Sequence, residues 1–178
     1  MHGKRDHVAP RRRDASRVIE RAQRLEQFLC LRKRSGGWKI EPAKIRGLRD
    51  TPAGEFEHER CEIAVLEVGM GGRLDATNVV RPLASLITPI GLDHTEYLGN
   101  TIRKIAAEKA GVIHRGAVVL TNNHDEAVLS VLRRRAAQFG CPFYEVSSDG
   151  SERPPLGGDF QRENTALARR SAELLAER

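Results

Sequence analysis

The sequence predicts an α/β fold in which a mostly parallel sheet is flanked by helices. Two observations carry this prediction. From Glu62 onward, short apolar runs alternate with segments of helical periodicity, and N-cap residues and glycines bound those segments. An order of strand, helix, strand, helix, strand is typical of a parallel sheet, because each parallel strand needs a crossover connection. A chain of 178 residues can form one globular core, so one domain is the starting expectation.

Four apolar runs are the expected strands. They cover residues 63–66, 84–88, 117–120 and, with a weaker pattern, 143–146. Short, mostly apolar runs of this length predict buried strands. Serine, glycine and proline follow the fourth run, so we expect a loop over residues 147–159.

Three helices are expected in the same part of the chain. The first covers residues 101–110, with Asn100 as its N-cap and Gly111 at its end. The second covers Glu126–Phe139 and follows Asp125, and the third begins at about Arg162. The first two fill the gaps between strands, as crossover helices do.

The first 60 residues differ from the rest in charge. They hold 16 basic and 9 acidic residues, a net charge of +7, whereas residues 61–178 hold 14 and 15. Apolar residues at helical spacing predict one amphipathic helix in this segment: Val18, Ile19, Ala22, Leu25 and Leu29. Residues 32–60 show no clear period and are expected to be loop. We therefore divide the chain into a basic N-terminal segment, 1–60, and an α/β part, 61–178.

Composition argues against several classes of protein. No apolar stretch approaches the roughly 18 residues of a membrane span, and the N-terminus lacks the apolar core of a signal peptide. Cys30, Cys61 and Cys141 form no CxxC pair, which argues against a zinc ribbon or a disulfide framework. We expect a cytoplasmic monomer without membrane contact.

Glu67 is the first residue with a candidate chemical role. It stands where the first expected strand ends and the glycine-rich segment 69–72 begins. Ligands gather at the carboxyl ends of parallel strands, where a carboxylate can hold a divalent cation. A solvated glutamate beside an ordinary turn explains the same position equally well.

Asp93 and His94 follow the second expected strand at the corresponding place. If that strand lies beside the first, the His94 imidazole comes near the Glu67 carboxylate. Oxygen and imidazole ligands together suit a divalent metal ion. An Asp-His pair in a loop is more often structural, so the pattern leaves both interpretations open.

Lys109 is expected on the apolar face of the first helix, with Ile102, Ile105, Ala106 and Ala110. A desolvated lysine has a lowered pKa, and its neutral amine can add carbon dioxide to form a carbamate. Such a carbamate acts as an extra carboxylate for a metal ion. The alternative is a side chain that reaches solvent from the helix end.

Three sequence strings occur in a fixed order. They are EVGMGGRLDATN at 67–78, then GLDH at 91–94 with LGNT at 98–101, then IAAEKAG at 105–111. Together they closely resemble the signatures of the folylpolyglutamate synthase/dihydrofolate synthase family, in the Mur ligase superfamily. The resemblance covers residues 61–146, and GDFQRENTA at 158–166 is similar to the family's later Gln-x-x-Asn motif.

The resemblance implies an incomplete Mur-ligase-type central ATPase domain from an ATP-dependent, ADP-forming amide ligase. In this family MgATP phosphorylates a carboxyl group of a folate or dihydropteroate, and the amine of L-glutamate attacks the acyl phosphate. Mg²⁺ is thus the implied cofactor and ATP a co-substrate. Carried over to this sequence, the roles are metal binding by Glu67, His94 and carbamylated Lys109, catalysis by His94 and Lys109, folate or pteroate binding by Arg73 and Asp75, and nucleotide binding by Asn164.

The sequence departs from the family in two respects. No Gly-Lys-Ser or Gly-Lys-Thr phosphate loop precedes Glu67, and the family's C-terminal ligase domain does not follow Asn164. The phosphate loop supplies backbone N–H groups, a lysine and a hydroxyl for magnesium. We therefore expect this chain to be inactive alone.

Two other interpretations stay open. One is another Mur-superfamily amide ligase, of the peptidoglycan-precursor or cyanophycin type, although the string GGRLDATN favours the folate branch. The other is a basic nucleic-acid-binding module in residues 1–60, whose basic runs at 11–13 and 32–34 could contact phosphates. Phe28, Trp38 and Phe56 are the aromatic residues available there for base stacking, so this indication is weak.

Overall fold

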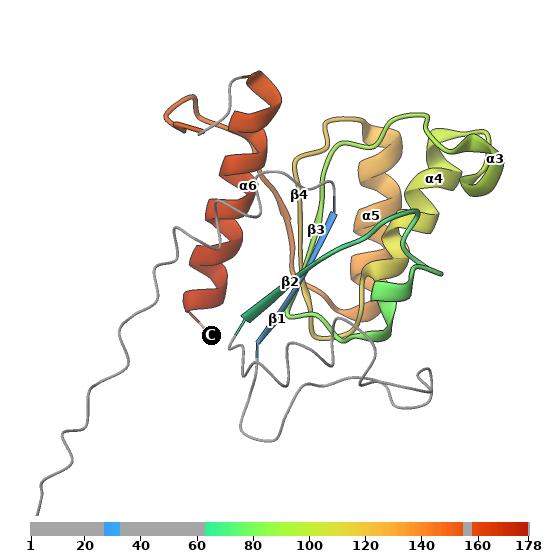
Figure 1. The fold of residues 1–178 in the computed structure, drawn as a ribbon, viewed down its shortest axis with the longest axis horizontal. Helices are drawn as coiled ribbons and strands as arrows, with labels where there is room; N and C mark the ends of the chain where they lie inside the picture. The colour runs from blue at the N-terminus through green and yellow to red at the C-terminus, as the bar shows by residue number, and fades with distance from the viewer. Residues whose placement is uncertain (1–26, 33–62, 155–157, 178) are drawn as a thin grey trace, which may run out of the picture.

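The computed structural model describes residues 27–32, 63–154 and 158–177. These residues form a five-stranded sheet with helices on both faces (Figure 1). The strands lie in the order β2-β1-β3-β4-β5. Their bounds are Gln27–Arg32 for β1, Ile63–Glu67 for β2, Ala84–Ile87 for β3, Val118–Thr121 for β4 and Phe143–Glu145 for β5.

Strands β3, β4 and β5 are parallel, as the sequence predicts. Ala84 pairs with Val118, and Val119 pairs with Phe143. All residues of β3 and β4 are buried, which fits a parallel strand covered on both faces. The predicted α/β class is therefore confirmed for this part of the sheet.

Strand β1 was not predicted, and it corrects the expected strand order. It lies between β2 and β3 and is antiparallel to both, with Phe28 opposite Glu67 and Gln27 opposite Ile87. The arrangement in which the first two expected strands lie side by side, which would bring His94 near Glu67, is therefore not the one observed. Leu29, which its helical spacing assigned to a helix, lies in β1. A short apolar run such as 28–31 fits a buried strand as well as a helix, so the pattern alone does not distinguish the two. The other residues of the predicted helix lie outside the described residues.

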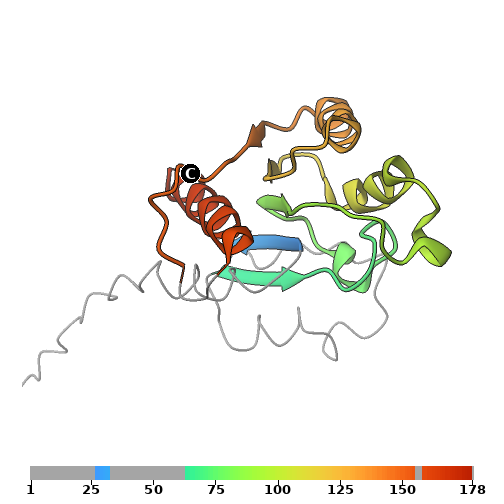
Figure 2. The same ribbon diagram turned by 90° about the horizontal axis from the view of Figure 1, so that it is seen from above.

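The helices cover the two faces of the sheet separately. Helices α4 (Ile102–Lys109) and α5 (Glu126–Phe139) pack on one face, and α6 (Asp159–Ala176) packs on the other (Figures 1 and 2). Successive strand residues point to opposite faces of the sheet and therefore pack in two separate cores. Ala84, Leu86, Val118 and Leu120 pack with α6 residues, whereas Ile87 and Val119 pack with residues of α4 and α5.

The helix ends agree with the sequence in part. Asp125 caps α5 by accepting a hydrogen bond from the Ala127 N–H, and Gly140 ends that helix with a φ of 64°. For α4 the N-cap is Thr101, whose hydroxyl accepts from the Lys104 N–H, and not the predicted Asn100. A threonine hydroxyl at the N-cap satisfies a free N–H of the first turn.

Four helical elements differ from the predicted pattern. The 3-10 turn η4 (Ala110–Val112) continues the chain through Gly111, where a stop was predicted. Helix α6 begins a few residues before the predicted start. Two short elements were not predicted: the 3-10 turn η3 (Ala76–Val79) and the helix α3 (Thr95–Leu98). Helix α3 follows the carboxyl end of β3, whereas η3 contacts Gly111 and His114, in the segment that precedes β4.

Two candidate site residues, Glu67 and His94, follow strands that end at one edge of the sheet. Strands β2 and β3 are each antiparallel to β1, so they run in the same direction as each other and as β4 and β5. The carboxyl ends of all four strands therefore lie at one edge. Glu67 ends β2, and the segment with His94 follows β3.

Candidate functional site

The glycine-rich loop, residues 69–75, is held together by the side chain of Asp75. One carboxylate oxygen accepts hydrogen bonds from the backbone N–H groups of Gly69 and Met70, at 3.1 and 3.2 Å. The other accepts from the backbone N–H and the hydroxyl of Thr77, at 2.8 and 2.6 Å. Each oxygen thus uses two donors, and Asp75 also forms the N-cap of η3.

These hydrogen bonds change the acidity of Asp75. Burial of the carboxyl group raises its pKa, but the hydrogen bonds from Thr77, Met70 and Gly69 lower it by more. The net pKa lies below the ordinary value of 3.8. Asp75 is therefore a carboxylate at neutral pH, and the loop conformation depends on that charge.

Arg73 fastens the glycine-rich loop to the end of α4. Its guanidinium donates to both carboxylate oxygens of Glu108 at 3.1–3.2 Å, and its backbone N–H donates to the Glu108 carbonyl at 2.9 Å. The loop lies close against the helix. A Cβ atom at Gly72 would come within 2.8 Å of the Glu108 carbonyl oxygen, and one at Gly111 within 2.4 Å of the Arg73 Cα. Glycine is thus required at both contacts.

Asn78 adds a buried connection between the same segments. Its amide nitrogen donates to the carbonyl oxygens of Arg73 and Gly111 at 3.0 and 3.3 Å. Its amide oxygen lies 2.7 Å from Nε2 of His114. Asn78 is 7% exposed; its hydrogen bond to Gly111 is buried, and its contacts with Arg73 and His114 are part-buried.

Lys109 is the last residue of α4 and is half-buried. Ile105 and Ala106, which share its predicted face, are fully buried, whereas Arg103 and Lys104 are exposed. The apolar face predicted for this helix is therefore present. The intermediate burial of Lys109 is compatible with a partly desolvated amine, and its carbamylation stays a prediction.

Asp93 and His94 lie on the exposed turn that precedes α3. The Asp93 carboxylate accepts from the His94 backbone N–H at 2.7 Å, and its other oxygen lies 3.6 Å from His94 Nε2. His94 has a φ of 50° and is the N-cap of α3. The left-handed backbone of a non-glycine residue is uncommon, and such residues concentrate at functional sites.

The candidate residues supply some of the ligand types that bind a divalent cation. Among the described residues, no three His, Cys, Asp or Glu side chains are grouped so that they could hold a metal ion. Glu67 and His94, both exposed, supply one carboxylate and one imidazole. A carbamate on Lys109 would add oxygen donors, which Mg²⁺ prefers. Because β1 separates β2 from β3, the ends of these two strands lie about 10 Å apart, at two strand spacings.

A buried asparagine fixes the turn after β3. The Asn123 amide nitrogen donates to the carbonyl oxygens of Ile87 and Thr88, at 3.2 and 2.8 Å, and its oxygen accepts from the Ile90 N–H at 2.8 Å. The Thr121 hydroxyl donates to the Ile87 carbonyl at 2.6 Å. These contacts hold the ends of β3 and β4 together.

A second group of amides lies between β4 and α6. The Asn122 side chain donates to Oδ1 of Asn164 at 3.2 Å. Within the described part of the chain, neither Oδ1 of Asn122 nor Oε1 of Gln161 has a hydrogen-bond partner, although both residues are more than nine-tenths buried. Buried acceptors without a donor are costly, so these two atoms are candidates for contact with a bound molecule.

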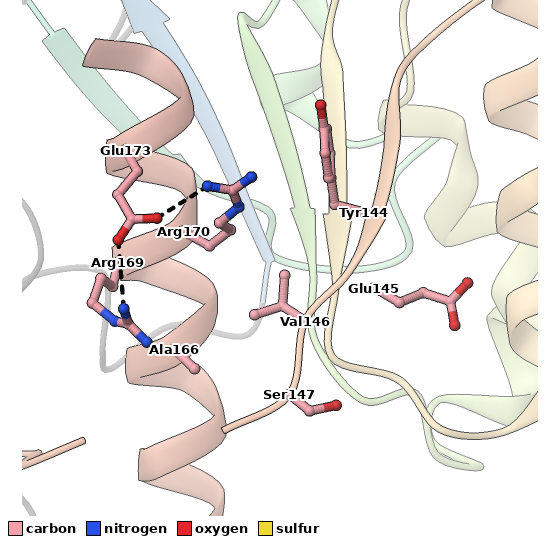
Figure 3. A pocket seen from close by; sticks show the side chains of 8 residues that line it. All are labelled: Tyr144, Glu145, Val146, Ser147, Ala166, Arg169, Arg170 and Glu173. Carbon is pink, nitrogen blue, oxygen red and sulfur yellow. Dashed lines mark hydrogen bonds and ion pairs between the residues drawn. The ribbon is translucent and has the colours of Figure 1, made fainter. Parts of the chain in front are cut away.

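A surface pocket of about 230 Å³ lies apart from these residues, between β5 and α6. Figure 3 shows its lining, which includes Tyr144 and Ser147 on one side and Arg169, Arg170 and Glu173 on the other. Both arginines form ion pairs with Glu173, at 3.5 and 3.1 Å. Glu67, His94 and Lys109 do not line it, so we assign it no part in the predicted chemistry.

Sequence reasoning missed Glu108, Asn78 and Asn123. Their partners are backbone carbonyls or residues more than 30 positions away, which no local pattern indicates. Glu108 could have been suspected, because it stands beside Lys109 in a recognisable string. Asn78 ends the string at 67–78 and could have been suspected in the same way, whereas Asn123 lies in none of the strings.

The fold and these residues define a class of protein: a three-layer α/β domain with polar groups at the carboxyl ends of its strands. The family model described as Mur ligase middle domain matches residues 51–174. The chain therefore belongs to the Mur ligase middle-domain family. Among the described helices, none has both the length and the apolar character needed to cross a bilayer.

Within this family the chain is similar to folylpolyglutamate synthases. It is 41% identical over 121 residues to the mitochondrial folylpolyglutamate synthase of Homo sapiens, covering 64% of this chain and 21% of the relative. It is 36% identical over 143 residues to the dihydrofolate synthase/folylpolyglutamate synthase of Bacillus subtilis, covering 67% and 33%. The chain thus spans a fifth to a third of the length of these relatives.

Solved structures agree with the sequence comparison. The apo form of L. casei folylpolyglutamate synthase superposes with a TM-score of 0.65 at 32% identity, over 69% of this chain and 36% of that one. A structure described as a folylpolyglutamate synthase–AMPPCP–folate complex gives a TM-score of 0.61 at 30% identity, with the same coverage.

Proposed function

We propose that this chain is part of the catalytic domain of an ATP-dependent ligase that joins L-glutamate to a folate or dihydropteroate. One observation carries the proposal: the strings at 67–78 and 91–101 begin after the carboxyl ends of β2 and β3, and the string at 105–111 contacts the first of them through Arg73 and Glu108, in a chain that is 41% identical to a folylpolyglutamate synthase. A neighbouring structure is described as a complex with AMPPCP and folate, which supports ATP and a folate as ligands.

In this proposal Glu67, His94 and the carbamate of Lys109 hold Mg²⁺. A divalent cation at this place would neutralise charge on a transferring phosphoryl group and orient the reactants. Glu67 and His94 are exposed and accessible to a ligand, and Lys109 is half-buried at the end of a helix packed into the core. The carbamate would form by addition of carbon dioxide to the neutral amine of Lys109.

The folate or pteroate would lie against the glycine-rich loop. Asp75 already accepts four hydrogen bonds, and Arg73 pairs with Glu108, so the two side chains chiefly set the shape of the loop. Arg73 is 55% exposed and can also meet a substrate carboxylate. Met70 and Leu74, 44% and 78% exposed, give the loop the apolar surface that a flat aromatic ligand needs.

The nucleotide would approach the amides of α6. Asn164 is half-buried, and the nearby acceptors Asn122 Oδ1 and Gln161 Oε1 are without donors in the described residues. The exocyclic amine of adenine is a donor that could satisfy such an oxygen. We therefore retain Asn164 as the nucleotide-binding residue and include Asn122 and Gln161 in the same site.

Calorimetric titration of the 178-residue chain tests this proposal. Dihydropteroate, tetrahydrofolate and MgATP are titrated separately into the wild type and into Asp75→Ala and Asn164→Ala. We expect Asp75→Ala to weaken binding of the folate compound and Asn164→Ala to weaken binding of ATP. Wild-type protein that binds none of the three ligands would contradict the proposal, and binding of a UDP-linked peptidoglycan precursor would favour another amide ligase of the superfamily.

The location in the cytoplasm, the monomeric state and the division at residue 60 stay predictions. The match to the family model begins at residue 51, within the segment assigned to the basic N-terminal region. Most of residues 1–60, on which the nucleic-acid interpretation rests, lie outside the described residues.

A further inference from the structure

We propose that Asn78 is a positioning residue for Lys109, and that it acts by fastening the glycine-rich loop to the turn that ends α4. The inference rests on the proposed function for the importance of Lys109. The geometry that supports it involves no substrate, nucleotide or metal ion.

The glycine-rich loop and the last turn of α4 are in direct contact. The Arg73 N–H donates to the carbonyl of Glu108, the residue before Lys109. A Cβ atom at Gly72 would lie 2.9 Å from the Lys109 carbonyl oxygen. The loop therefore covers the last turn of α4, and any separation of the two segments would change the surroundings of Lys109.

Asn78 is a buried side chain that joins the segments, in addition to the Arg73–Glu108 ion pair. It reaches the loop at the Arg73 carbonyl, the turn after α4 at the Gly111 carbonyl, and His114 four residues after Ala110. Its nitrogen must donate to two carbonyl oxygens, so its oxygen must face His114, and His114 Nε2 then carries a hydrogen. A group with both a donor and an acceptor is needed, and an aspartate of the same shape would supply acceptors alone.

A second contact between the segments is weaker. The ion pair of Arg73 and Glu108 is partly exposed, with side chains 55% and 27% accessible. Water and salt screen such pairs, and they commonly contribute little. Asn78, 7% exposed, is therefore the stronger connection.

Competitive acetylation of lysines, followed by mass spectrometry, tests the proposal without any ligand. Lys104, exposed on the same helix, is the internal reference, so the measured quantity is the ratio of Lys109 to Lys104 modification. Asn78→Asp should raise this ratio about tenfold, as expected when the hydrogen bonds of a buried group are lost. A milder variant, His114→Ala, keeps both Asn78 donor contacts and should raise the ratio about threefold.

Asn123→Asp is the matched control. Asn123 is 5% exposed and also donates to two carbonyl oxygens and accepts one N–H, but at the ends of β3 and β4. It should lower the melting temperature as Asn78→Asp does and leave the lysine ratio within about twofold of wild type. If Asn78→Asp does not fold, the lysine ratio of His114→Ala decides whether the positioning role holds. An unchanged ratio in the Asn78 or His114 variant, or an equal rise in the Asn123 variant, would overturn the positioning role. Because no ligand is used, failure of the proposed function would appear in the titrations and not here.

Discussion

Asp75 and Thr77, two residues apart, form a closed hydrogen-bonded turn. The Thr77 hydroxyl and backbone N–H both donate to one carboxylate oxygen of Asp75, at 2.6 and 2.8 Å. The other oxygen holds Gly69 and Met70. A single carboxylate therefore organises the whole glycine-rich loop, and its substitution should be felt beyond its own position.

Replacing Asp75 by Asn should destabilise the chain by about 1–2 kcal/mol. The amide keeps one acceptor oxygen but turns an NH₂ group toward two N–H donors at the other position. Asp125→Asn is the control, since Asp125 caps α5 through one oxygen and asparagine caps equally well. Urea unfolding measures both, and equal losses in the two variants would contradict the network described for Asp75.

The stabilisation from Asp75 should depend on pH. Its pKa is lower in the folded chain than the ordinary 3.8, so the folded state binds its proton less readily than the unfolded state. The contribution is present above the unfolded value and is lost as the pH falls through the lower, folded value. We expect the stability difference between wild type and Asp75→Asn to be constant from about pH 5 to pH 7 and to shrink below about pH 4. A difference that grows on acidification would contradict this sign.

Gly111→Ala should destabilise the chain by about 3 kcal/mol or more. A Cβ at this position would lie 2.4 Å from the Arg73 Cα, and backbone cannot move aside as a flexible side chain can. Gly91→Ala is the control, because a Cβ atom there would meet no described atom within 4 Å, and it should change stability by less than about 0.5 kcal/mol. Thermal unfolding of the two variants compares them directly.

The sequence predicts which residues form each strand and helix better than it predicts which strands are adjacent in the sheet. The runs at 63–67 and 118–121 are largely apolar, and Asp125 and Gly140 mark the ends of α5 in the chain itself. The order of the strands in the sheet is harder to predict. That β1 separates β2 from β3 depends on pairing between residues over 30 positions apart, and a short apolar run indicates neither its secondary structure nor its partners.

The candidate site was also predictable only in part. The helical spacing of Lys109 predicted its position on an apolar face, and the helix has that face. The role of Asp75 inside the loop was not predictable, since three of its four donors are backbone N–H groups. The contact between Asn122 and Asn164 joins residues 42 positions apart, so it became visible only with the fold.

Lys109 should form a carbamate when the chain is incubated with ¹³C-labelled bicarbonate. Lys109 is half-buried at the end of α4, whereas Lys104 is exposed on the same helix. We expect a carbamate signal in the ¹³C NMR spectrum of wild type and of Lys104→Ala, and its loss in Lys109→Ala. A signal that persists in Lys109→Ala would assign the modification to another amine, and the metal role proposed for Lys109 would lose its basis.

The last prediction concerns turnover by the 178-residue chain. Its sequence contains no Gly-Lys-Ser or Gly-Lys-Thr loop, the element that gives phosphates their backbone donors, a lysine and a magnesium-binding hydroxyl. Phosphoryl transfer depends mainly on positioning and charge neutralisation, and the loss of one electrostatic contact commonly costs about 10² to 10³ in rate.

Several such groups are missing together, and although such losses are not simply additive, their total should be large. With MgATP, L-glutamate and dihydropteroate or tetrahydrofolate, we therefore expect ADP release and folate product at far below about 1 s⁻¹, the lower end of ordinary enzyme rates. The Lys109→Ala variant serves as the blank for contaminating activity. Turnover of about 1 s⁻¹ by wild type and not by Lys109→Ala would show that this chain has another phosphate-binding element, because rates of that size require one.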